Sequence, residues 1–181
     1  MNLKNNISYS RQTIVPKDIN EVNKVLKSDF ITQGPINLKF EKKINNYVGS
    51  KYCSTANSAT SALLAACKAL GLGKGDRLWT STNSFVASSN SGLLCGAKVD
   101  LIDINLFNYN LDIDQLEKKL KKAKKNNKLP KIVMPIHFAG YPCDMKKIFS
   151  LSKKFKFKII EDASHALGSA RDGVKVGSCK Y

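Results

Sequence analysis

The 181-residue chain has little arginine for a protein of its charge. Lysine and arginine together number 30 against 14 acidic residues, which gives a formal net charge of +16, yet the only arginines are Arg11, Arg77 and Arg171. Arginine is the side chain that most often binds phosphate groups and base edges in nucleic-acid complexes. The shortage of arginine therefore argues against a nucleic-acid partner, although the net charge alone would favour one.

The lysines are instead concentrated in two stretches. Thirteen of them fall within residues 118–128 and 146–158. Beside the first stretch, apolar residues recur at helical spacing, at Ile113, Leu116, Leu120 and Ala123. This pattern predicts an amphipathic helix whose lysines face water, and such a solvated face explains the charge without a polyanionic ligand.

Cysteine pairs with metal-site or redox-motif spacing are missing. The five cysteines are dispersed and include no C-x-x-C pair, so we expect reduced thiols and no disulfide framework. His137 and Cys143 are the only residues we considered as metal ligands. Two ligands without partners at matching spacing do not make a zinc site, and we expect no bound metal.

Long apolar runs and targeting signals are also missing. No apolar run approaches the roughly 20 residues that a membrane-spanning helix needs. Residues 1–6 (MNLKNN) are polar and lack the apolar core of a signal peptide. We therefore expect a cytoplasmic protein with no membrane partner.

Two common nucleotide and hydrolase motifs are absent as well. The sequence contains neither a P-loop nor a G-x-S-x-G nucleophile elbow. Residues 71–76 (GLGKGD) are glycine-rich, but they follow an expected helix, whereas a dinucleotide-binding loop must follow a strand. We interpret them as a helix C-cap and a turn.

What the chain does contain is an alternation of strands and helices. We expect helices near residues 16–28, 36–48, 62–70, 86–94, 113–125 and 145–155, and strands near residues 52–56, 77–81, 98–103, 130–136 and 159–161. Such alternation predicts an α/β fold with a mostly parallel sheet and helices on both faces. The helix at residues 62–70 is apolar almost all round, so we expect it to be covered on more than one side.

Two strand ends carry polar residues that could form a site. Residues 159–169 (IIEDASHALGS) run from a buried strand into Asp162 and His165, and ligands of open α/β sheets bind at the carboxyl ends of strands. Residues 57–61 (NSATS) open a helix, where free N–H groups and hydroxyls can hold an anion. A helix-capping aspartate with an ordinary histidine, and simple N-capping by Asn57 or Ser58, are the alternatives.

Four of these junctions, in this order, resemble one family. They are residues 57–63 (NSATSAL), 80–88 (TSTNSFVAS), 137–140 (HFAG) and 161–168 (EDASHALG). Residues 7–12 and 28–35 add to the likeness. Together they resemble the sugar aminotransferases of the DegT/DnrJ/EryC1/StrS family, which are fold-type I enzymes that depend on pyridoxal 5′-phosphate (PLP).

The resemblance implies a role for five residues as cofactor-binding groups. Asp162 would face the pyridine nitrogen and keep the ring protonated, so that the ring can withdraw electrons. Phe85 would stack on the ring. Ala59 and Thr60 would hold the phosphate at the start of their helix. His165 would lie near the ring.

The resemblance also implies the reaction and its partners. It implies transfer of an amino group from an amino acid, glutamate in the usual case, to C4 of a UDP-linked 4-keto-6-deoxy sugar in surface-polysaccharide biosynthesis. It further implies a homodimer with residues of both subunits at each site. Residues 129–140 and 176–181 resemble most the members that act on the pseudaminic acid route.

The sequence departs from the family in one respect. The lysine that forms the Schiff base with the cofactor belongs to a segment that would follow Tyr181, so the resemblance assigns no catalytic residue within this chain. We expect residues 1–181 to form the N-terminal part of an incomplete fold-type I large domain, without the remaining strands and the small C-terminal domain, and to be inactive alone. A PLP-dependent sugar dehydratase of the same family and a non-catalytic remnant or partner module are the alternatives.

Overall fold

The computed structural model describes residues 11–181, so the polar residues 1–6 and residues 7–10 of the opening motif lie outside the described part. The main elements follow one another along the chain as α1 (Pro16–Leu26), α2 (Pro35–Val48), α3 (Ala59–Ala69), β1 (Arg77–Ser81), α4 (Ala87–Leu94), β2 (Lys98–Ile102), α5 (Ile113–Lys125), β3 (Ile132–Met134), α6 (Met145–Phe155) and β4 (Lys158–Ile159). From β1 onward strands and helices alternate, as the sequence predicts.

The strands β1 to β4 form one parallel sheet in the order β2-β1-β3-β4. Trp79 of β1 lies opposite Asp100 of β2 on one side and Val133 of β3 on the other. A parallel bridge between Ile136 and Asp162 continues the pairing of β3 and β4 beyond their ends. The sheet therefore brings the segments after β1, β3 and β4 to one edge.

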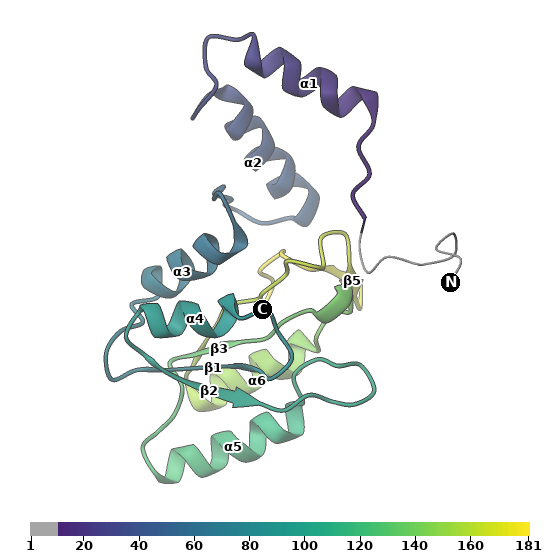
Figure 1. The fold of residues 1–181 in the computed structure, drawn as a ribbon. Coiled ribbons are helices and arrows are strands. Elements are labelled where there is room, and N and C mark those ends of the chain that lie inside the picture. Colours follow the sequence, from purple (N-terminus) through teal and green to yellow (C-terminus); the bar gives the residue numbers. More distant parts are fainter. Residues whose placement is uncertain (1–10) are drawn as a thin grey trace, which may run out of the picture.

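Helices cover both faces of this sheet (Figure 1). The alternation of side chains along β1 sends Leu78 into a core with α3 and α4, and Trp79 into a core with α5 and α6. In β3, Ile132 and Met134 join the first core and Val133 joins the second. The predicted α/β architecture is thus confirmed.

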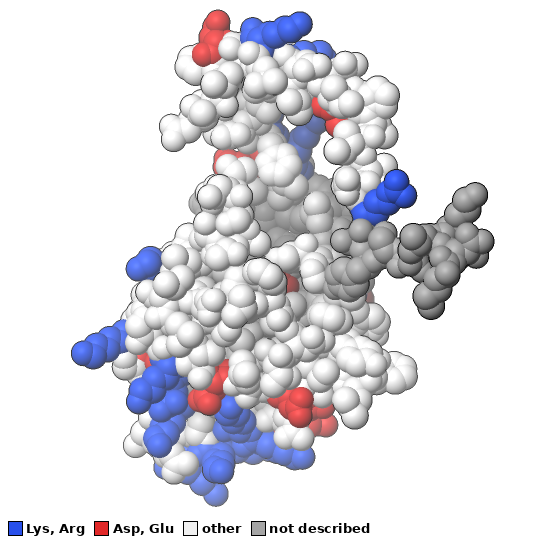
Figure 2. Space-filling model, viewed as in Figure 1, with Lys and Arg blue, Asp and Glu red and all other residues white. Residues whose placement is uncertain are grey.

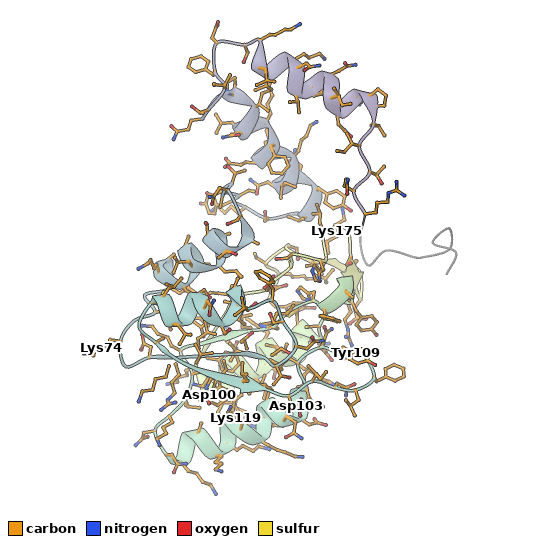
Figure 3. The ribbon with its side chains drawn as sticks, viewed as in Figure 1. Lys74, Asp100, Asp103, Tyr109, Lys119 and Lys175 are labelled. Carbon is orange, nitrogen blue, oxygen red and sulfur yellow. The ribbon has the colours of Figure 1, made fainter. Side chains whose placement is uncertain are left out.

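The lysine-rich helices are amphipathic, as predicted. In α5, Leu116, Leu120 and Ala123 are buried, and the lysines lie on the outer side. Figure 2 shows basic side chains gathered at the end of the molecule where α5 lies. Lys119 also lies close to the sheet, with its Nζ 3.4 Å from Oδ1 of Asp100 (Figure 3).

Two expectations about secondary structure are wrong. Residues 52–56 form no strand, because no strand among residues 11–181 pairs with them, and Tyr52 is 77% exposed. A strand gains its stability from a partner and not from local propensity alone. Helix α3 is covered by residues 11–181 on one face only, where Leu63 and Cys67 are buried.

A short hairpin near the end of the chain, β5 (Ala170–Arg171) and β6 (Val174–Lys175), turns at Asp172 and Gly173, as predicted. Both turn residues have positive φ, which glycine adopts without strain. Lys175 reaches from this hairpin to the end of α2. Its Nζ donates to the carbonyl oxygen of Tyr47 at 2.7 Å and lies 4.1 Å from the centre of the Tyr47 ring.

The first helix contributes no buried residue. Ile19, Val22 and Leu26, which recur at helical spacing, are all more than half exposed in α1. An apolar stripe of this kind normally packs against other apolar side chains. Among residues 11–181, no helix combines the length and the apolar character needed to cross a membrane.

Candidate functional site

A pocket that is open to solvent lies at the carboxyl edge of the sheet. It is built from the start of α3, the loop between β1 and α4, and the segments that follow β3 and β4. Its lining residues are Ala59, Thr60, Leu63, Ser84, Phe85, Ala87, Ile136, Phe138, Asp162, Ser164 and His165. All five residues that the resemblance assigned to the cofactor are among them, so segments more than 100 residues apart meet here.

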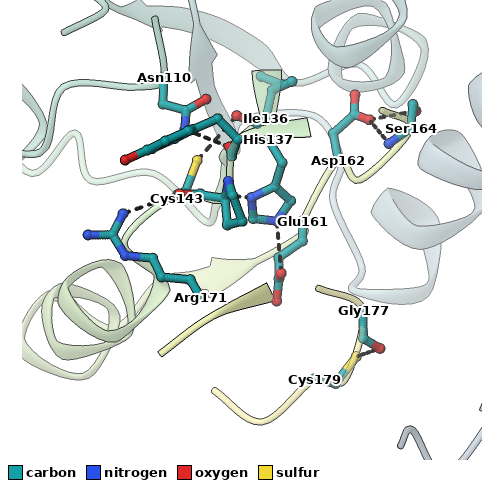
Figure 4. Close-up of polar contacts among 12 residues, drawn as sticks. Asn110, Ile136, His137, Cys143, Glu161, Asp162, Ser164, Arg171, Gly177 and Cys179 are labelled. Carbon is teal, nitrogen blue, oxygen red and sulfur yellow. Dashed lines mark hydrogen bonds and ion pairs between the residues drawn. The ribbon is translucent and has the colours of Figure 1, made fainter. Parts of the chain in front are cut away.

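Asp162 is the buried charged group of this pocket, with 6% of its surface exposed. Oδ1 accepts hydrogen bonds from the Ser164 hydroxyl at 2.7 Å and the Ser164 N–H at 3.2 Å (Figure 4). Oδ2 accepts one from the Ser88 hydroxyl at 2.9 Å. Three donors therefore hold the carboxyl group in one orientation.

The start of α3 presents backbone donors to the same pocket. Ser58 is the N-cap, and its Oγ accepts the N–H of Ser61 at 3.2 Å. The N–H groups of Ala59 and Thr60 have no hydrogen-bond partner within residues 11–181, as expected for the first turn of a helix. Capping and anion binding are thus compatible here, since the cap uses only one of the available donors.

Aromatic side chains form the walls of the pocket. Phe85 lines the pocket and is 73% exposed, so much of its ring is open to a ligand. Phe138 and His165 face each other edge-on, with ring centroids 6.3 Å apart. These surfaces suit a flat ring as ligand.

Several residues of this site were not predicted from the sequence. Ser88 and Ser164 bond to Asp162, Ser84 bonds to Ser88, and Phe138 supplies a second aromatic wall. One signal was available for the serines. Ser84 and Ser88 are spaced one helical turn apart directly after a buried strand, and Ser164 follows Asp162 at the spacing of an Asx turn.

His137 and Cys143, considered above as metal ligands, are engaged within the fold. The fully buried His137 ring places Nε2 3.0 Å from Oε2 of Glu161, and Nδ1 accepts the Cys143 N–H at 3.0 Å. The Cys143 thiol donates to the carbonyl oxygen of Ile136 at 3.2 Å. Burial, together with the nearby Glu161 carboxylate, raises the pKa of Cys143 to about 12, so the thiol stays protonated.

The matching family profile is that of the DegT/DnrJ/EryC1/StrS aminotransferases, and it covers residues 12–180. The chain belongs to this family of PLP-dependent enzymes. The fold agrees, because the chain superposes on Helicobacter pylori PseC, an aminotransferase of pseudaminic acid biosynthesis, with a TM-score of 0.86 at 32% identity. That superposition covers 94% of this chain and 44% of PseC.

Two further relatives show the range of the family. A Campylobacter jejuni protein named UDP-4-amino-4,6-dideoxy-N-acetyl-beta-L-altrosamine transaminase is 40% identical over 172 residues, which are 95% of this chain and 44% of the relative. The PLP form of a Streptococcus pneumoniae protein described as a sugar aminotransferase has a TM-score of 0.84 at 29% identity, over 95% of this chain and 46% of the other. The chain thus spans less than half the length of the relatives it matches.

Proposed function

We propose that the pocket around Asp162 is the PLP site of a nucleotide-sugar aminotransferase. In this proposal residues 1–181 form the N-terminal part of its large domain, and the protein acts in the cytoplasm. The single observation that supports the proposal most strongly is the meeting of Asp162, the α3 N–H groups and Phe85 in one pocket. These three features match three different parts of the cofactor.

Asp162 fits the ring nitrogen. Its Oδ2 accepts only the Ser88 hydroxyl among the described residues, and a carboxylate oxygen can accept two hydrogen bonds. One acceptor position is therefore available to an N–H donor of a ligand. A buried carboxylate that accepts such a bond favours the protonated form of the donor, which is the electron-withdrawing state of a pyridine ring.

The start of α3 fits the phosphate. The N–H groups of Ala59 and Thr60, the Thr60 hydroxyl and the positive end of the helix dipole all favour a dianion. Phe85 would cover one face of the ring, and its large exposed area would then be buried. His165 would contact the ring from the opposite wall, beside Phe138.

When bound, the cofactor supplies an electron sink that stabilises negative charge on the reacting carbon. The residues of this chain hold the ring, keep its nitrogen protonated and anchor its phosphate. Among residues 11–181, none of those that line the pocket is a lysine. We therefore propose that the lysine that forms the Schiff base comes from outside the 181 residues, and that the chain alone does not complete the transfer.

The proposed substrates are based on the names of the relatives. Proteins named for UDP-linked amino sugars support a UDP-linked 4-keto-6-deoxy sugar as acceptor, in pseudaminic acid or another surface-polysaccharide route. An amino acid, glutamate in our proposal, would be the donor. The exposed apolar stripe of α1 supports a homodimer, because pairing with a second copy would bury it.

The test is a titration of the chain with pyridoxamine 5′-phosphate. Binding is measured by calorimetry or by the quenching of the fluorescence of the single tryptophan. This ligand binds without a lysine, so the chain should bind it, and pyridoxamine without the phosphate should bind about tenfold more weakly. The variant Asp162→Asn should lose about tenfold in affinity, because the amide no longer favours a protonated ring nitrogen. Asp114→Asn, on the outer helix α5, is the matched control and should bind as the unsubstituted chain does. Equal affinity of all three proteins would contradict the proposed site.

A further inference from the structure

Ser88 connects helix α4 to the candidate site without entering it. Its side chain is fully buried and does not line the pocket, yet its Oγ lies 2.9 Å from Oδ2 of Asp162. On its other side, its Oγ lies 2.6 Å from Oγ of Ser84, which does line the pocket. A chain of two hydroxyls therefore runs from the pocket wall, behind the pocket, to the buried carboxyl group.

The direction of these hydrogen bonds follows from which groups can donate a proton and which can only accept one. An ionised carboxylate only accepts, so the single hydroxyl proton of Ser88 points to Asp162. Ser88 then has no proton left for Ser84, so the Ser84 hydroxyl is the donor in the 2.6 Å contact between them, and the carbonyl oxygen of Phe85 at 3.0 Å is its second, longer acceptor. Each hydroxyl donates toward the carboxylate, and bonds aligned in this way strengthen one another.

The two oxygens of Asp162 are not equivalent. Oδ1 accepts two hydrogen bonds, both from Ser164, which belongs to the same loop. From the described part of the chain, Oδ2 accepts only the bond from Ser88, which belongs to a different element 74 residues earlier in the sequence. Without Ser88 the carboxylate would be held only by its own loop, and Oδ2 could turn away from the pocket.

Helix α4 holds Ser88 firmly. Gly92, one turn later, packs so closely on the sheet that an added Cβ would lie 2.9 Å from Cγ2 of Val99. Ser91 is also buried, and its hydroxyl donates to the carbonyl oxygen of Ser88 at 3.0 Å. The donor that Ser88 offers to Asp162 is thus fixed by the packing of the helix on the sheet.

We propose that Ser88 is a positioning residue, which aims Oδ2 of Asp162 at the ring nitrogen of the bound pyridine, with Ser84 orienting the Ser88 hydroxyl. This inference rests on the proposed function in so far as it names the ligand. Its first part, that Ser88 orients the carboxylate, is independent of any ligand.

The first experiment needs no ligand. The carboxyl carbon of Asp162 is observed by NMR in the unsubstituted chain, in Ser88→Ala and in Ser88→Cys, which nearly keeps the volume but donates weakly. Both variants should shift this signal. Ser89→Ala, which removes a serine hydroxyl that lies on the same helix and bonds to the carbonyl oxygen of Val86, should leave it in place. An unchanged signal in the Ser88 variants would overturn the inference.

The second experiment compares pyridoxamine 5′-phosphate with its analogue in which carbon replaces the ring nitrogen. The unsubstituted chain should prefer the pyridine compound by about tenfold, because only that compound can bond to Asp162. Ser88→Ala and Ser88→Cys should reduce this preference about threefold and leave the affinity for the carbon analogue unchanged. Ser89→Ala should keep the full preference.

The outcomes separate the inference from the proposed function. If the unsubstituted chain shows no preference between the two compounds, the role of Asp162 in the proposed function is wrong, and the ligand-free NMR signal still decides whether Ser88 orients the carboxylate. If the preference exists but Ser88→Ala leaves it unchanged, the inference is overturned and the proposed function stands. A preference that rises in Ser88→Ala would also overturn it, since Ser88 would then compete with the ligand for Oδ2.

Discussion

His137 and Glu161 face each other behind the candidate site, with 3.0 Å between Nε2 and Oε2 (Figure 4). Because Nδ1 of His137 accepts the Cys143 N–H, its proton is on Nε2 and the ring donates to the carboxylate. Each residue directly adjoins a pocket residue, Phe138 or Asp162, but points to the other face of the sheet. The pair thus joins the ends of β3 and β4 beneath the pocket.

Replacing this histidine should destabilise the fold. His137→Leu would leave the Cys143 N–H and the Glu161 carboxylate without their partner, which should lower the free energy of unfolding by about 2 kcal/mol. Urea denaturation measures the loss. His165→Leu, a change of the exposed second histidine, is the control and should cost less than about 0.5 kcal/mol. An equal loss of unfolding free energy in both variants would show that the hydrogen bonds of His137 add no stability to the fold.

Close packing of α4 on the sheet gives a second prediction. In Gly92→Ala the new Cβ would lie 2.9 Å from Cγ2 of Val99 and 3.2 Å from Cβ of Leu78. Such overpacking should cost about 1–3 kcal/mol in thermal or urea unfolding. Gly73→Ala is the matched control, because nothing lies within 4 Å of an added Cβ there and its φ is not positive. A Gly92→Ala protein as stable as Gly73→Ala would show that helix and sheet separate easily.

Lys131 and Asp76 give a prediction with a defined pH dependence. The Lys131 ammonium donates to Oδ2 of Asp76 at 2.8 Å, and this hydrogen bond lowers the pKa of Asp76 below its ordinary value. A lowered carboxyl pKa stabilises the fold above the ordinary value of about 4, and the contribution is lost as the pH falls through the folded-state value.

Lys131→Met should therefore destabilise the chain by about 0.5 kcal/mol at pH 7, since the pair is partly exposed. The difference from the unsubstituted chain should shrink as the pH falls below about 4. Urea denaturation between pH 7 and pH 2.5 measures it, with Lys122→Met on the exposed side of α5 as control. A difference that does not change with pH would show that the ammonium acts through its second acceptor, the carbonyl oxygen of Gly71 at 2.6 Å.

The apolar stripe on α1 gives the last prediction. Ile19 is 54% exposed and Val22 is 58% exposed, so the chain should associate with itself through this helix. Changing both residues to lysine should weaken the association about tenfold or more, which sedimentation velocity over a concentration series measures. Asn20→Lys together with Asn23→Lys adds the same charge to α1 without removing apolar surface and should keep the association. A monomer at all concentrations in the unsubstituted chain would contradict this prediction.

Local sequence determined most of the elements. The spacing of Leu116, Leu120 and Ala123 is enough to predict α5 and its buried face, because a helix repeats every 3.6 residues whatever surrounds it. The strand at Arg77–Ser81 was also predicted with its observed bounds. Asp162 was expected at the end of a buried strand, and the structure places it there.

The tertiary structure decided what depends on partners distant in the sequence. Residues 52–56 have strand-like composition but no partner strand among residues 11–181, so they remain irregular. Resemblance could assign Ala59, Thr60, Phe85, Asp162 and His165 to one site, but only the folded sheet brings them to one pocket. The bond from Ser88 to Asp162 spans 74 residues, and no local periodicity encodes it, because it exists only when α4 packs beside the end of β4.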